Sequence, residues 1–467
     1  GTDAELMPAL LAYMRAAANQ DRGDEVFSVV TAAGEVGSGT TMAAMGQHFA
    51  KMLPSGRRLR VNSCACVFDV DNAGSDDSHF TGENLFLRDS SGRLLPPSER
   101  DRKVEETVRE AAAAVGEDGK PTYGCIVVHM VLGSKTGQCM PSSECLDRIQ
   151  KTYGNLVLPV VDACQGRLSG GIIRSNLDKG RVVLITGSKF FGGPPFCGGC
   201  LLSWANGQEL EGHLAEGAAM GKMVDRSKLR EYVVASLLSD DLPQMRALLP
   251  QRPLNYGVLM RWTLALHGME AFFVDVPSKE RSRVMAEWVK GVQAHVKGMK
   301  EPFVKLLDDG IEEPAADDTQ GIALSTIISF HCRCNRGTPE GGCSDMTMDE
   351  MRRVQFLMAS DLATDHAYLT LLASARKKCF MGQPVDLAPG NTETLANRHV
   401  LRIAASAPLV VRMYNEGVEA VLAEDRALFE KLNLVLGNWF IFNPSPRPRK
   451  DSWEPESSTP PRKESSC

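Results

Sequence analysis

The chain has 467 residues, of which 43% are hydrophobic and 24% charged, and its formal net charge is −6. This length allows two or three domains with large cores. The net negative charge gives no positive electrostatic field that would attract nucleic acid. No apolar run approaches the roughly 20 residues that cross a bilayer. We therefore expect a globular protein that binds neither nucleic acid nor a membrane.

The chain starts Gly1-Thr2-Asp3-Ala4-Glu5, which predicts the beginning of a helix that runs to about Ala18. Because the first residue is not Met and no signal peptide is visible, we expect a truncated N-terminus, with any targeting segment lying upstream. The 13 cysteines are odd in number and scattered, several of them in apolar runs. This pattern favours reduced core cysteines in the cytoplasm or another reducing compartment.

Short apolar runs alternate with helical patterns through the first 203 residues. The predicted strands cover residues 25–31, 58–68, 123–132, 156–162, 181–186 and 197–203. The predicted helices between them cover residues 41–52, 98–115 and 142–153. Such alternation favours an α/β fold with a mostly parallel sheet covered on both faces.

A helical pattern over residues 207–308 precedes a second, smaller α/β region. Its predicted strands cover residues 321–330, 379–385 and 399–405, and Thr347 with Glu350 predicts a capping box that opens a helix to about residue 362. We expect a large domain over 1–275 and a small C-terminal α/β domain over 276–442. Residues 443–467 have no apolar pattern, which predicts a disordered tail.

Polar side chains follow two successive buried strands. Asp162-Ala-Cys-Gln165 ends one strand, Thr186-Gly-Ser-Lys189 ends the next, and Arg402 lies on a late strand. Strand carboxyl ends are where α/β sheets bind ligands. A Lys among small and aromatic residues loses its proton more easily, and a neutral amine condenses with an aldehyde. Asp162 would keep a pyridine nitrogen protonated. Gly1 and Thr2 at a helix N-terminus, with Ser188, would offer donors to a phosphate.

Residues 160–202 resemble the core of fold-type I pyridoxal-phosphate (PLP) enzymes, and within them the class V aminotransferase and cysteine desulfurase group. The resemblance implies a three-layer PLP-dependent transferase fold and a homodimer with the active site near the interface. It implies Lys189 as the Schiff-base lysine, Asp162 at the pyridine nitrogen, and Arg402 at the carboxylate of a small amino-acid-like substrate. The other implied cofactor contacts are Gly1, Thr2, Ser134, Gln165 and Ser188.

Two features depart from this group. Residues 34–37 contain no His to stack on the cofactor ring, and Ser134-Lys135-Thr136-Gly137 stands where the group has Asn-Glu-x-Gly. We expect an aminotransferase; the alternatives are a lyase of the cysteine desulfurase type and a non-catalytic pseudoenzyme. Cys379 lies where desulfurases carry a nucleophile, but the Phe380-Met381 that follows favours a buried structural thiol.

Two other kinds of site are weighed against this interpretation. The glycine-rich stretches 34–40 and 133–136 do not fit the Gly-x4-Gly-Lys-Ser/Thr spacing of a nucleotide-binding P-loop. His331, Cys332, Cys334 and Cys343 lack the paired Cys-x2-Cys spacing of a structural zinc site. We expect neither a P-loop nor a metal site.

Overall fold

The computed structural model describes residues 2–50, 52–53, 56, 58, 79–165, 167, 169–216, 229–251, 255–309, 326–337, 342–365, 369, 373–389 and 397–443. Three predictions lie largely or wholly outside these residues. They are the Gly1 contact, most of the 58–68 strand, and the tail beyond residue 443.

The first half of the chain forms a six-stranded sheet in the order β2-β1-β3-β4-β5-β6, in which every neighbouring pair is parallel except β5 and β6. The strands are β1 (Glu25–Val30), β2 (Phe80–Asn84), β3 (Tyr123–Val131), β4 (Val157–Asp162), β5 (Val182–Thr186) and β6 (Gly198–Leu201). The predicted α/β fold with a mostly parallel central sheet is confirmed.

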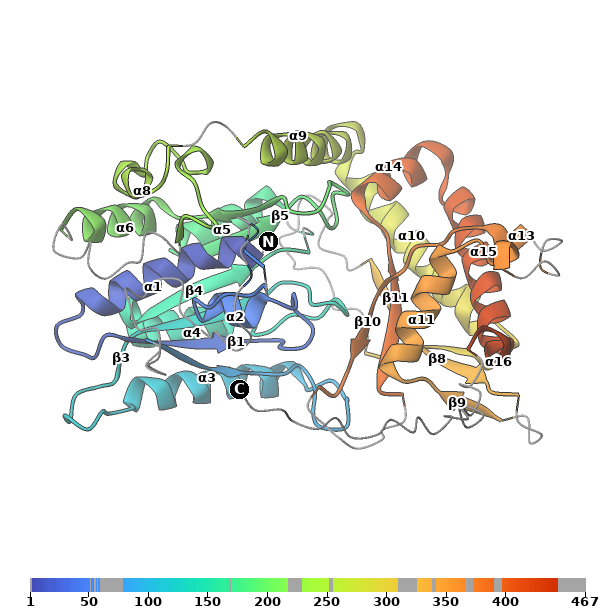
Figure 1. Ribbon diagram of the computed structural model, residues 1–467, viewed down its shortest axis with the longest axis horizontal. Helices are drawn as coiled ribbons and strands as arrows, with labels where there is room; N and C mark the ends of the chain where they lie inside the picture. The colour runs from blue at the N-terminus through green and yellow to red at the C-terminus, as the bar shows by residue number, and fades with distance from the viewer. Residues whose placement is uncertain are drawn as a thin grey trace, which may run out of the picture.

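Helices cover both faces of this sheet (Figure 1). Along β3, Cys125 and Val127 pack into the core beneath α1 (Leu6–Ala18), whereas Ile126 and Val128 pack toward α3 (Pro97–Ala113). Because alternate residues point to opposite faces, a strand buried on both faces is apolar throughout. The remaining elements are η1 (Thr2–Glu5), α2 (Thr40–Ala44), α4 (Ser143–Tyr153), η2 (Gly154–Leu156), α5 (Gly170–Asp178), α6 (Trp204–Glu216), η4 (Ala235–Leu237), α8 (Pro243–Leu248) and α9 (Tyr256–Glu270).

The second α/β region contains an antiparallel sheet in the order β10-β11-β8-β7, with β9 paired to β8. The strands are β7 (Val304–Leu306), β8 (Ile327–Asn335), β9 (Cys343–Asp345), β10 (Gly382–Asp386) and β11 (His399–Ala404). The helical elements are η5 (Ala271–Asp275), α10 (Ser278–Lys297), α11 (Met348–Ala359), α12 (Leu362–Asp365), α13 (Ala373–Arg376), α14 (Ala407–Glu416), α15 (Val418–Gly437) and α16 (Trp439–Phe442). The domain boundaries at 275 and 442 stay a prediction.

Three expectations about single elements were wrong. The helix expected over 41–52 is only the five-residue α2, which Gly46 follows with a φ of 62° that a helix cannot continue. The edge strand β2 was not predicted, and β7 lies in a region expected to be helical. Of the helices that the structure describes, none has the length and apolar character to cross a membrane.

Candidate active site

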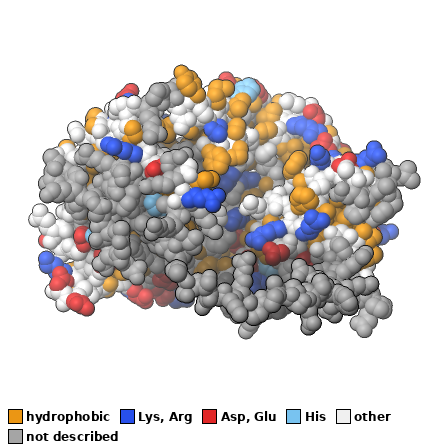
Figure 2. All heavy atoms as spheres, viewed as in Figure 1, with side chains coloured by type: hydrophobic (Ala, Val, Ile, Leu, Met, Phe, Trp, Pro, Cys, Tyr) orange, Lys and Arg blue, Asp and Glu red, His pale blue; other side chains and the backbone are white. Residues whose placement is uncertain are grey.

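A cavity of about 470 Å³ lies between the carboxyl-terminal ends of β3, β4 and β5 and the second sheet. Residues of β8, β10 and β11 form its opposite wall. Lys and Arg side chains gather near the middle of the molecule, where the two sheets' regions meet (Figure 2). Five of the residues predicted from the sequence line this cavity: Thr2, Asp162, Gln165, Lys189 and Arg402.

The acidic group comes from the end of β4. Asp162 is the last residue of that strand, and its Oδ1 accepts a hydrogen bond of 2.9 Å from the backbone N–H of Cys164. Gln165 follows in the next turn, where Gly133, with a φ of 87°, would place a Cβ only 3.4 Å from the Gln165 side chain. Position 133 therefore favours glycine because of its positive φ, and Gln165 packs against it at an ordinary contact distance.

The lysine lies on a turn that packs closely against α9. A Cβ on Gly187 would lie 2.3 Å from the Cβ of Ala265, and one on Gly193 would lie 2.8 Å from it, so both positions need glycine. The turn is closed by a 2.9 Å hydrogen bond from Gly193 N to Gly187 O. The amine of Lys189 makes no hydrogen bond or ion pair with any residue that the structure describes, which leaves it available to a ligand.

The N-terminal turn is held beneath the cavity by a buried polar pair. Glu5 and His129 are both 2% exposed, and Glu5 Oε2 lies 3.2 Å from His129 Nε2. Burial raises the pKa of the Glu5 carboxyl. Burial alone would lower the pKa of His129, but the adjacent Glu5 carboxylate outweighs this effect, so the pKa of His129 is raised. Because Thr2 is three residues from Glu5 on the same 3-10 turn, this pair fixes Thr2 at the cavity.

Two predicted serines are not among the cavity-lining residues. The Ser134 hydroxyl donates to Glu35 Oε2 at 2.8 Å, and the Ser188 hydroxyl lies 2.8 Å from that of Thr186. Each hydroxyl already has a partner within the chain. Their assignment as cofactor contacts stays a prediction that the cavity geometry does not support.

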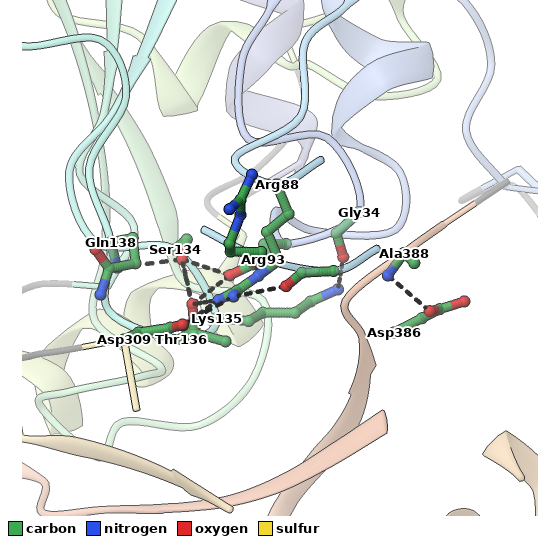
Figure 3. A network of polar contacts seen from close by, with 12 residues as sticks. Gly34, Arg88, Arg93, Ser134, Lys135, Thr136, Gln138, Asp309, Asp386 and Ala388 are labelled. Carbon is green, nitrogen blue, oxygen red and sulfur yellow. Dashed lines mark hydrogen bonds and ion pairs between the residues drawn. The ribbon is translucent and has the colours of Figure 1, made fainter. Parts of the chain in front are cut away.

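A buried ionic cluster around Arg88 borders the cavity, and sequence reasoning missed it (Figure 3). Arg88 Nε donates to Glu35 Oε1 at 2.7 Å, and its Nη1 donates to Asp309 Oδ1 at 3.0 Å. Ser134 and Thr136 donate to the other oxygen of Glu35. Glu35 also lines the cavity, so this cluster joins the first sheet's loops to the segment after β7.

Arg167 is a second cavity residue that sequence reasoning missed, although it lies only two positions beyond Gln165. Burial and the nearby charge of Arg402 lower the pKa of Arg167 to about 10. Burial also lowers the pKa of Arg402, and burial with the Arg402 charge lowers that of Lys135. Burial is the largest cause of each lowered pKa, and an anion bound beside these groups would raise each pKa.

Cys379 lies away from the cavity. It is 5% exposed within the hydrophobic core of the C-terminal region, and its backbone N–H donates to Met358 O at 2.8 Å. Burial raises the pKa of the Cys379 thiol. These facts agree with the buried structural thiol that the sequence favoured. Among the described residues, no three His, Cys, Asp or Glu side chains form a group that could hold a metal ion.

Comparisons with known proteins give only distant similarities. No family model matches the sequence, and no curated protein matches it. The chain is similar in structure to Oryza sativa TDC with PLP (12% identity, 91% of this chain and 68% of that chain, TM-score 0.40). It is also similar to Sphingomonas wittichii serine palmitoyltransferase (13% identity, 91% of this chain and 71% of that chain, TM-score 0.40). A third similar structure is a transaminase from the marine bacterium Virgibacillus (12% identity, 93% of this chain and 74% of that chain, TM-score 0.43). These identities and TM-scores are too low to carry a conclusion about this chain.

Proposed function

We propose that this chain is a PLP-dependent enzyme that acts on a small amino-acid-like substrate, and that it is an aminotransferase. The observation that carries the proposal is the convergence of Lys189, Asp162 and Arg402 on one cavity. These residues come from two different sheets and are separated by up to 240 positions. A primary amine, a carboxylate and a guanidinium facing one space are the three groups that a PLP site for amino acids requires.

The groups at the cavity fit the cofactor by their chemistry. Lys189 offers an amine that no described residue engages, and Thr2 offers a hydroxyl near the start of a helical segment for a phosphate. Arg402 Nε is buried without a hydrogen-bond partner, as expected of a donor that awaits a ligand.

Bound PLP would supply an electron sink for the bonds at the substrate α-carbon. Lys189 would provide the amine that holds the cofactor, and the same amine would accept or donate a proton at the substrate α-carbon. The Asp162 carboxylate, whose Oδ1 accepts from Cys164 N–H, would hold a proton on the pyridine nitrogen. Arg402 orients the substrate by donating to its α-carboxylate.

The position of Cys379 favours transamination over desulfuration. A desulfurase needs an accessible thiolate to attack the substrate sulfur, and the raised pKa and burial of Cys379 oppose both requirements. The two reaction classes separate on the product, because a transaminase accumulates a keto acid and a desulfurase releases sulfur. A pseudoenzyme would bind PLP and give neither product.

A homodimer is part of the proposal, and helix α9 supports it. Its side chains Tyr256, Leu259, Met260, Leu264 and Leu266 are exposed, and hydrophobic side chains gather over α9 at the top of Figure 2. A large exposed apolar patch marks an interaction surface. Since α9 packs on the Lys189 turn through Ala265, a second copy bound there would lie near the cavity. Leu264→Glu should then convert a dimer into a monomer in sedimentation analysis.

The decisive experiment is chemical labelling. The protein is incubated with PLP, reduced with borohydride, digested and examined by mass spectrometry for a pyridoxyl group. We expect the label on Lys189 and its loss in Lys189→Ala, while Lys151→Ala, at an exposed position on α4, keeps it. A label on Lys135, the other cavity lysine, or one scattered over surface lysines would overturn the proposal.

A further inference from the structure

The cavity contains more positive charge than a simple amino acid and its cofactor explain. Four cationic side chains line it, Lys135, Arg167, Lys189 and Arg402, against two acidic ones, Glu35 and Asp162. Glu35 is already engaged by Arg88 at 2.7 Å. Among the residues that line the cavity, Asp162 is then the one carboxylate without an arginine partner, against four cations.

Arg402 lines the cavity with a guanidinium whose hydrogen bonding is incomplete. Its Nη1 donates to Lys135 O at 2.7 Å, and its Nε is buried with no hydrogen-bond partner. Gly382 makes this placement possible, because a Cβ there would lie 2.6 Å from both Cγ and Nε of Arg402. One unsatisfied donor beside the cavity is what a bound carboxylate oxygen would satisfy.

Arg167 has only neutral acceptors. Its Nε donates to Thr326 Oγ1 at 3.1 Å, its Nη1 donates to Gln165 oxygens at 3.4 Å, and its Nη2 donates to Ala405 O at 3.4 Å. Its guanidinium stacks 4.9 Å above the Phe190 ring. Charge-assisted bonds to carboxylates are shorter, about 2.7–2.9 Å.

Two other partly buried arginines, by contrast, pair with carboxylates. Arg15 donates to both oxygens of Glu209 at 2.6 and 2.7 Å, and Arg398 donates to both oxygens of Asp386 at 2.8 Å. Among the described residues, Arg167 and Arg402 have no such partner. Two guanidinium groups at one cavity, neither of them paired with a carboxylate, have the chemistry to bind two anionic groups.

We propose that Arg167 and Arg402 together bind a substrate with two carboxylates, so that the enzyme acts on an acidic amino acid and its dicarboxylic keto acid. This inference rests on the proposed function, in which Arg402 binds the α-carboxylate. Arg167 binds the side-chain carboxylate and thereby determines specificity. The cofactor phosphate is the other anion that could reach Arg167, and the experiment separates the two sources.

The test is calorimetric titration of the protein with glutarate and with valerate, which match in carbon number but differ by one carboxylate. The titrations use the protein with and without PLP. We expect glutarate to bind at least tenfold more tightly in both states. Arg167→Gln should weaken glutarate binding about ten- to hundredfold and leave valerate unchanged. Arg402→Gln should weaken both ligands, and Arg174→Gln, at an exposed position on α5, neither.

Equal binding of glutarate and valerate by the unmodified protein would overturn the inference without any variant. An Arg167→Gln protein that loses affinity for PLP while its glutarate and valerate affinities are unchanged would assign Arg167 to the phosphate and also overturn it. The proposed function fails separately, through absence of the pyridoxyl label on Lys189. A protein that carries the label but does not prefer glutarate keeps the proposed function and loses only the inference.

Discussion

Replacing Arg88 should destabilise the protein more than most single substitutions, because it would leave two carboxylates without their cation. The side chains of Arg88, Glu35 and Asp309 are 2%, 4% and 12% exposed. Removing one partner of a buried ion pair costs about 3–5 kcal/mol, mostly because the other charge remains buried. We expect Arg88→Met to lower the free energy of unfolding by an amount in this range.

The same reasoning predicts that a second substitution rescues the first. Glu35 is the more deeply buried carboxylate, so its stranded charge should account for most of the loss. Glu35→Gln removes that charge and keeps an oxygen to accept from Ser134 and Thr136. We expect Arg88→Met with Glu35→Gln to recover about 2 kcal/mol or more relative to Arg88→Met alone.

Urea unfolding at neutral pH, followed by both circular dichroism and tryptophan fluorescence, measures these free energies if the two transitions coincide. Arg93→Met is the matched control, because Arg93 is 82% exposed and pairs only at the surface with Asp89, so its loss should be within about 0.5 kcal/mol. A loss below 1 kcal/mol for Arg88→Met would refute the reasoning. So would a double variant that is less stable than the single one.

Three further substitutions have definite expected outcomes. Gly382→Ala should displace the Arg402 side chain and raise the KM for the amino acid about tenfold, with PLP labelling unchanged, as steady-state kinetics would show. Burial raises the pKa of Asp425 to about 6, so native stability falls as the pH rises through 6 and this carboxyl ionises. Asp425→Asn, which still accepts from Trp288 Nε1, should therefore stabilise the protein by about 2 kcal/mol at pH 8 and hardly at all at pH 4 by urea unfolding. The Cys379→Ser variant should still convert the amino acid to its keto acid in the first half-reaction. In the native protein, Cys379 should react slowly with thiol reagents because it is buried.

The parallel strands were predictable because burial on two faces produces continuous apolar sequence, as in β3 and β4. The predicted Thr347–Glu350 capping box is also present. In addition, the structure shows that the Ser142 side chain caps α4 by accepting from Cys145 N. The edge strand β2 carries no such pattern, because four of its five residues are exposed and its backbone pairing with β1 alone defines it. An exposed edge strand of this kind has no apolar pattern from which it could be predicted.

The residues of the candidate site were also only partly predictable from the sequence. Asp162, Gln165 and Lys189 were predictable, because they follow neighbouring parallel strands whose carboxyl ends meet. The partners of Arg88 were not predictable, since Glu35 and Asp309 lie 53 and 221 positions away in sequence. Ser134 stays a predicted cofactor contact, and in the structure its hydroxyl donates to Glu35 Oε2.

The arginines where the two sheets meet differ in whether the chain provides carboxylates to pair with their charge. Arg88 pairs with two carboxylates of the chain itself, and it therefore connects the first sheet's loops to the segment after β7 without a ligand. Arg167 and Arg402 also cross this boundary, through Ala405 O and Lys135 O, but their contacts use neutral oxygens and leave their charge unbalanced. A bound dianion would supply the missing carboxylates to an arginine from each side of the boundary. Ligand binding should therefore strengthen the contact between the two sheets, which couples substrate choice to the stability of the cavity itself.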